Sequence, residues 1–181
     1  MLPPPRPHAA KRWKKKSKYT RCYNVAMEQE QTQDIGAMMQ SYAEDAVRMA
    51  REFRVELDYS EQSLEQVEHL LDELHEELQN GPAPKTSQSA ERSSNQQVDE
   101  MSRIWGGYLG EVVRRRFGGE WTIEKYPAGD FLIVTLNVNG AKVFPAMKIH
   151  KRLTNGAADN LLAFYQNVRA RLEAKPGGKV Q

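Results

Sequence analysis

The fold is decided by residues 131–149, which read FLIVTLNVNGAKVFPAMKI. Residues 131–138 form a short apolar run, which is typical of a central β-strand that is covered on both faces. Asn139-Gly140 then favours the type I′ turn of a two-residue hairpin. We expect residues 141–149 to return as a strand. Because Pro145 cannot donate a hydrogen bond to a sheet, this strand should lie at an edge or contain a bulge.

Another strand and four helices are expected around this hairpin. Residues 121–126 alternate between apolar and polar side chains, which predicts a strand and an antiparallel meander in the order 1-2-3. Apolar residues recur every three or four positions in 31–54, 60–80 and 97–117, so three helices should precede the sheet. A last helix follows Gly156. This order of elements predicts an α+β domain.

Two glycines in the third predicted helix indicate close packing. Gly106 and Gly110 lie one turn apart, and each costs about 1 kcal/mol in a helix interior, so a packing reason is expected. They do not follow a strand, and no Lys-Ser or Lys-Thr completes a phosphate-binding loop. We expect Glu111 beside them to be partly buried and paired with a base such as Lys151. Other residues with expected structural roles are Trp121 and Pro145.

The first predicted helix carries three methionines on its apolar face, Met38, Met39 and Met49. Methionine is flexible and polarizable, so such residues are typical of adaptable core packing. A binding groove that accepts varied partners is the alternative interpretation.

Composition and charge describe a soluble domain with three electrically different segments. The 181 residues are 28% charged and 39% hydrophobic, with a net charge of +2 and a mean hydropathy of -0.73. Residues 1–26 carry +8, residues 27–97 carry −11 and residues 98–181 carry +5. This composition excludes collagen, a coiled-coil rod, a disulfide scaffold and a membrane protein. The single cysteine, Cys22, permits no disulfide within the chain, which favours a reducing cytoplasm.

The chain divides into a basic arm, one domain and a short tail. Residues 1–26 are predicted to be a disordered arm, because they combine four prolines with a run of like charges. This arm is a candidate for nucleic-acid binding, or alternatively an extension upstream of a natural start at Met27. Residues 27–175 form the domain, with a flexible linker at 82–95, and residues 176–181 form a frayed tail.

Two charged surfaces are candidates for binding. The acidic one lies on the helix predicted for 60–80 and comprises Glu65, Glu68, Asp72, Glu73, Glu76 and Glu77. The basic one comprises Arg114, Arg115, Arg116, His150, Lys151 and Arg152. The helix predicted for 60–80 also carries His69, Asp72, Glu73, His75 and Glu76, but its two histidines lie six residues apart and face different directions, so a metal site is not favoured. We therefore predict no metal and no cofactor.

Short motifs spread over the domain resemble a family of uncharacterised bacterial domains. The residues that carry the resemblance lie within about 55–172 and include Tyr108-Leu109-Gly110-Glu111, Gly118-Gly119-x-Trp121 and Lys151-Arg152-Leu153-x-Asn155-Gly156. The resemblance implies a small cytoplasmic α+β domain and supplies no catalytic residues. Small bacterial proteins of this general class include immunity proteins that block a cognate toxin.

Three functions are consistent with these features. The leading hypothesis is a non-catalytic protein-binding domain of immunity type, in which the acidic surface attracts a basic protein such as a toxin. The second is nucleic-acid binding through residues 1–26 and the arginine run, which requires that the arm be present. The third is an enzyme for a small ligand, which requires Glu111 and His150 to converge on one pocket. No membrane partner is expected.

Overall fold

The computed structural model describes residues 18–80 and 87–174, with side chains placed over 35–80 and 95–174. It confirms the α+β class. The elements in chain order are α1 (Lys18–Glu52), α2 (Ser63–Asn80), α3 (Ser87–Phe117), β1 (Glu120–Lys125), β2 (Leu132–Val138), β3 (Ala141–Val143), α4 (Pro145–Asn155), the 3₁₀ helix η1 (Gly156–Asp159) and α5 (Leu161–Glu173).

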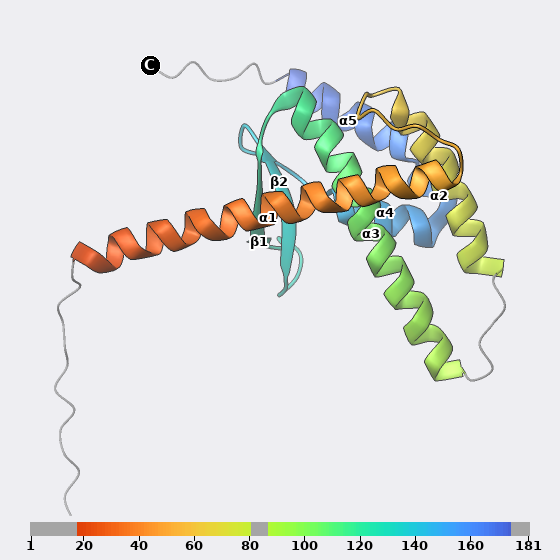
Figure 1. Cartoon of the computed structure of the whole chain (residues 1–181), viewed down its shortest axis with the longest axis horizontal. Helices are drawn as coiled ribbons and strands as arrows, with labels where there is room; N and C mark the ends of the chain where they lie inside the picture. Colours follow the sequence, from red (N-terminus) through yellow and green to blue (C-terminus); the bar gives the residue numbers. More distant parts are fainter. Residues whose placement is uncertain (1–17, 81–86, 175–181) are drawn as a thin grey trace, which may run out of the picture.

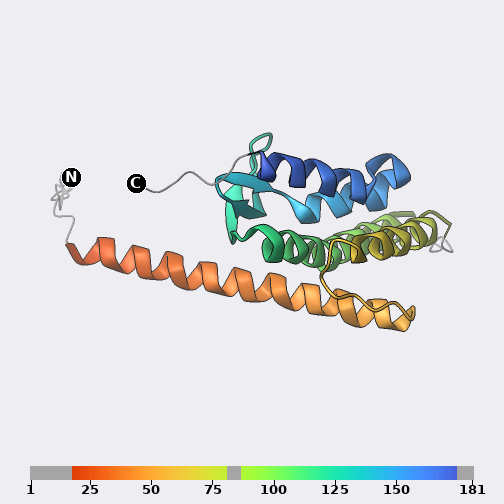
Figure 2. The same cartoon turned by 90° about the horizontal axis from the view of Figure 1, so that it is seen from above.

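The helices form three layers, which are seen edge-on in Figure 2. Helix α1 makes one outer layer, α2 and α3 lie in the middle, and α4 and α5 make the other outer layer. The sheet lies where α3 ends, and α1 crosses in front of α3 and the strands in Figure 1. The N-terminal part of α1 extends beyond the other elements.

Glycines allow α3 to pack closely on three sides. A Cβ at Gly106 would lie 2.6 Å from the Cα of Ala146 in α4, and one at Gly107 would lie 2.8 Å from the carbonyl oxygen of Met39 in α1. A Cβ at Gly110 would overlap the ring of Trp121. Glycine is therefore required where α3 meets α4, α1 and β1.

The sheet has the predicted antiparallel order β1-β2-β3, with β2 in the centre. Trp121 pairs with Leu136, and both are buried. The turn between β2 and β3 is the expected two-residue turn, since Val138 pairs with Ala141 and both Asn139 and Gly140 have positive φ.

The prediction of a strand over 141–149 is wrong beyond Val143. Strand β3 ends there, and Pro145 begins α4 at the N1 position. Proline suits N1 because its fixed φ is helical and the N–H at that position would have no partner within the helix. His150, Lys151 and Arg152 consequently lie on a helix instead of at a strand end. Two α-helices, α4 and α5, follow the sheet where one was expected.

Two helices begin earlier than predicted. Helix α1 starts at Lys18, so residues 18–26 of the predicted arm are helical, while residues 1–17 lie outside the described residues. Helix α3 starts at Ser87, inside the linker predicted for 82–95. Both extensions are free of proline, and adding residues to an existing helix avoids the cost of nucleation. The tail predicted for 176–181 also lies outside the described residues.

Candidate protein-binding surfaces

The six carboxylates of the predicted acidic face divide into two groups on α2. Glu65, Glu73, Glu76 and Glu77 are exposed, and none of them forms an ion pair with another residue whose side chain is described. We call these four residues the α2 acidic face. Glu68 and Asp72 instead point toward α4, where both contact Arg152.

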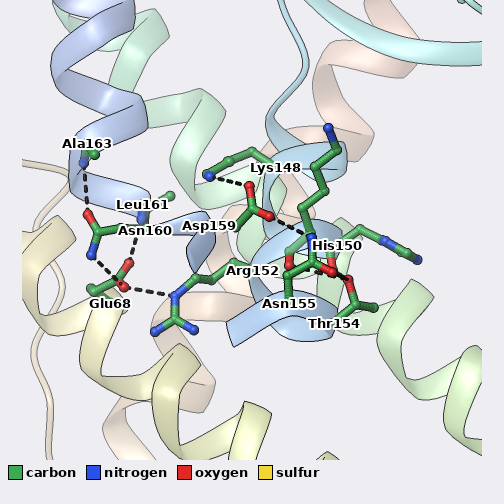
Figure 3. Close-up of polar contacts among 11 residues, drawn as sticks. Glu68, Lys148, His150, Arg152, Thr154, Asn155, Asp159, Asn160, Leu161 and Ala163 are labelled. Atoms are coloured by element: carbon green, nitrogen blue, oxygen red, sulfur yellow. Dashed lines mark hydrogen bonds and ion pairs between the residues drawn. The ribbon is translucent and has the colours of Figure 1, made fainter. Parts of the chain in front are cut away.

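Arg152 and Glu68 form a buried ion pair that connects α2 with α4 and α5. The Arg152 side chain is 0% exposed, and its Nε donates to Glu68 Oε1 over 2.8 Å. The Nδ2 of Asn160 donates to the same oxygen over 2.9 Å, and the backbone N–H of Leu161 donates to Oε2 over 2.7 Å (Figure 3). The second partner of Arg152 is Asp72. Glu68 therefore also satisfies a backbone donor at the start of α5.

This pair corrects the assignment of Arg152 to a basic surface patch. Burial lowers the pKa of Arg152, but its hydrogen bonds to Asp72 and Glu68 outweigh that effect and hold the pKa above its ordinary value. The side chain stays charged inside the domain and is neutralised by α2. Glu68 and Asp72 are correspondingly removed from the acidic face.

Glu111 is almost fully buried, with an exposed fraction of 1%, and its partner is Arg114 instead of Lys151. Arg114 donates to both carboxylate oxygens, over 2.7 and 2.8 Å, and Trp121 Nε1 donates over 3.0 Å. Burial raises the pKa of Glu111, but the hydrogen bonds from Arg114 and Trp121 outweigh it, so the pKa lies below its ordinary value. This geometry supports an ionised carboxylate that ties α3 to β1.

The other two arginines of the run are also engaged by neighbours. The guanidinium of Arg115 lies 3.5 Å from the centroid of the Tyr59 ring. Arg116 forms an ion pair of 3.2 Å with Glu61, which also binds Arg169 of α5. Of the six members of the predicted basic patch, Arg152 is buried, Arg114 is partly exposed, and Arg115, Arg116, His150 and Lys151 are exposed.

A groove runs between α1, α3, β2 and α4, with a volume of about 780 Å³. We call it the α1–β2 groove. Its apolar lining includes Met38, Met39, Phe131, Leu132 and Met147, and its polar lining includes Asp99, Arg103 and His150. Leu132 is 71% exposed, Phe131 51% and Met38 39%. Glu111 is not among the lining residues, so Glu111 and His150 do not share this groove.

A second hollow of about 600 Å³ continues the groove along α1 and α3. Tyr42, Asp99 and Arg103 line both spaces. The second hollow adds Asp45 and Glu100, so three carboxylates and one guanidinium line it. We call this part the acidic end of the groove.

The groove residues were missed in the sequence because they come from four separate elements. The sequence contained one indication, which was the group of methionines in the first helix. The structure divides them: Met39 is buried in the core, Met49 packs against the core, and Met38 lines the groove. The interpretation as core packing therefore holds for Met39 and Met49, while Met38 lines the groove.

The remaining candidates have structural contacts. His75 Nδ1 lies 2.6 Å from the carbonyl oxygen of Leu153, and Asp72 is bound to Arg152. Within the described ranges, no three His, Cys, Asp or Glu residues gather in a way that could hold a metal. No described helix offers the long apolar stretch that crossing a bilayer requires. Comparisons with family models, curated proteins and solved structures found no match to this chain.

Proposed function

We propose that the domain is a non-catalytic protein-binding domain that binds a basic partner through the α2 acidic face. An immunity-type inhibitor of a basic toxin is the specific form of this function that we favour. The observation that carries the proposal is the separation of the helix carboxylates. Two of them, Glu68 and Asp72, pair with Arg152. Glu65, Glu73, Glu76 and Glu77 are exposed without a cationic partner among the described side chains.

The charge of the domain supports the same proposal. Residues 27–181 carry a net charge of −6, since the +8 of residues 1–26 accounts for more than the whole positive balance. An acidic surface attracts a basic protein over about one Debye length, raises the association rate and gives binding that weakens with salt. The exposed carboxylates of α2 lie on one continuous helix, so they can act together.

The nucleic-acid alternative has less support from the folded part. Arg114, Arg116 and Arg152 are paired with carboxylates, and Arg115 lies over an aromatic ring. The hypothesis also relies on the basic segment 1–26, whose side chains lie outside the described residues.

The test is affinity capture by the full chain from a nuclease-treated bacterial lysate at low salt, followed by carbodiimide cross-linking of carboxylates to lysines. We expect a captured protein with a net positive charge, with cross-links at Glu73 and Glu77. The variant Glu73→Lys/Glu77→Lys should lose at least about nine-tenths of the captured protein, because like charges then face each other.

A variant with the same change in net charge serves as the control. Glu52→Lys/Glu120→Lys reverses two exposed carboxylates away from α2 and should capture as much as the unaltered chain. Equal losses in both variants would show a general charge effect and contradict the assignment to α2. Capture from an untreated lysate that is absent from the nuclease-treated one would favour nucleic acid.

A further inference from the structure

We propose that the α1–β2 groove is a second docking site, which takes an amphipathic helical segment of a partner protein that has an apolar face and a cationic end. This site is separate from the α2 acidic face, since its lining comes from α1, α3, β2 and α4. The proposal therefore stands or falls independently of the proposed function.

The apolar part of the groove exposes side chains that a folded domain ordinarily buries. Leu132 begins β2 and is 71% exposed, Phe131 directly precedes it and is 51% exposed, and Met38 of α1 lines the same groove. Met147 of α4 also lines the groove, and its side chain is flexible. Methionines that line an open apolar surface can adjust to the side chains of a docked helix.

The acidic end determines the charge of the occupant. It shares Tyr42, Asp99 and Arg103 with the apolar part, so the two hollows adjoin at these residues. Its lining has three carboxylates and one guanidinium, and Arg48 beside it pairs with Asp45 while His150 lies 3.9 Å from Asp99. Glu100 is exposed and has no ion pair with another described side chain. A segment that places leucine-like side chains in the apolar part therefore finds a favourable position for Lys or Arg at the acidic end.

The openness of the groove favours a helical segment over a small molecule. Sites for small ligands enclose most of the ligand surface, whereas Leu132 at this rim is 71% exposed. A helix about 10–12 Å across buries only one face, which is what an open groove can cover.

Neither a second copy of the domain nor the chain's own basic segment suits the groove as well. In a two-fold symmetric dimer built on this groove, each copy would present the same lining, whose cations are Arg103 and His150 against three carboxylates. The run of bases at 11–16 extends at most about 25 Å from Lys18, whereas Asp45 at the acidic end lies about 40 Å from Lys18 along α1. The basic run of the same copy therefore cannot reach the acidic end.

The experiment selects occupants from a displayed library of helical peptides, with leucines fixed on one face and the end positions randomised, using the full chain as bait. We expect the selected peptides to be enriched in Lys and Arg at one end. Binding of a selected peptide to the full chain labelled with ¹³C-methyl methionine should shift the NMR signals of Met38, Met39 and Met147. The signals of Met49 and Met101, which do not line the groove, should stay unchanged.

Substitutions inside and outside the groove show which residues contribute to the affinity for the selected peptide. Leu132→Asp should weaken the selected peptide by at least about tenfold, because it places a charge where an apolar anchor docks. Phe53→Asp alters an apolar residue outside the groove that is 45% exposed, and it should leave the affinity unchanged. Asp99→Lys should abolish the preference for a cationic end.

Four results would overturn the proposal. They are selection of acidic or uncharged ends, binding that Leu132→Asp does not weaken, a library that yields no peptide dependent on Leu132, and methyl shifts that change with protein concentration in the absence of peptide. The last would indicate a second copy in the groove. The variant Glu73→Lys/Glu77→Lys should bind the selected peptide normally, which separates this outcome from that of the α2 acidic face.

Discussion

Replacing Arg152 by methionine tests the buried ion pair that connects α2, α4 and α5. The substitution Arg152→Met keeps a long side chain in the same space and removes the guanidinium. Glu68 then retains two donors, Asn160 Nδ2 at 2.9 Å and the Leu161 N–H at 2.7 Å, but loses its only charged partner among the described residues. Asp72, which is half exposed, can regain water.

The expected loss in the free energy of unfolding is about 3 kcal/mol. Removing one partner of a buried ion pair costs about 3–5 kcal/mol, because the remaining charge is left buried without compensation. The lower end applies here, since the two remaining hydrogen bonds stabilise the Glu68 carboxylate. In a domain of this size, each kcal/mol changes the Tm by about 2–4 °C, so the Tm should fall by roughly 6–12 °C.

Urea unfolding followed by circular dichroism measures this loss at neutral pH. Lys151→Met is the matched control, because Lys151 is exposed on the same helix and its replacement should change the unfolding free energy by less than about 0.5 kcal/mol. Adding Glu68→Gln to Arg152→Met should cost less than the two separate losses combined, because the two side chains interact. If Arg152→Met costs no more than the control, the ion pair does not stabilise the fold and the reasoning is wrong.

Two further substitutions test packing and protonation. Gly110→Ala should destabilise the domain by about 1–3 kcal/mol in urea unfolding, because its Cβ would overlap Trp121; Gly36→Ala, where the added Cβ meets no atom within 4 Å, should not destabilise it. Glu111→Gln should lower stability at neutral pH and have little effect in acid. The pKa of Glu111 is depressed in the fold, so the stability it contributes is present above its ordinary pKa of 4.5 and is lost as the pH falls through the folded value. Unfolding free energies of both chains from pH 7 down to pH 3 should converge, and parallel curves would contradict the assignment.

The local patterns predicted most of the fold. Helical periodicity located α2 and the C-terminal part of α3, and the Asn139-Gly140 turn with its flanking strands predicted the antiparallel sheet in the observed order. The error around Pro145 arose because an edge strand and a helix start both tolerate proline. Ile149 and Leu153 are buried four residues apart on α4, and that spacing was the available indication of a helix.

The charged residues were less predictable than the elements that carry them. Arg152 reads as part of a surface run, and its partner Glu68 is 84 residues away in the sequence, so only the packing of α4 on α2 identifies the pair. The contact of Glu111 with Arg114 could have been predicted from the sequence, since residues three apart on a helix are neighbours. The α1–β2 groove could not be predicted from the sequence, because its lining residues come from four elements that are separate in the chain.

The position of Pro145 also affects how the sheet ends. Strand β3 has three residues, and the chain turns into α4 directly after Phe144. A long edge strand offers unpaired backbone groups on which another chain can add a strand, and short edges reduce that hazard. The proline that begins α4 therefore also keeps this edge of the sheet too short to serve as a template for aggregation.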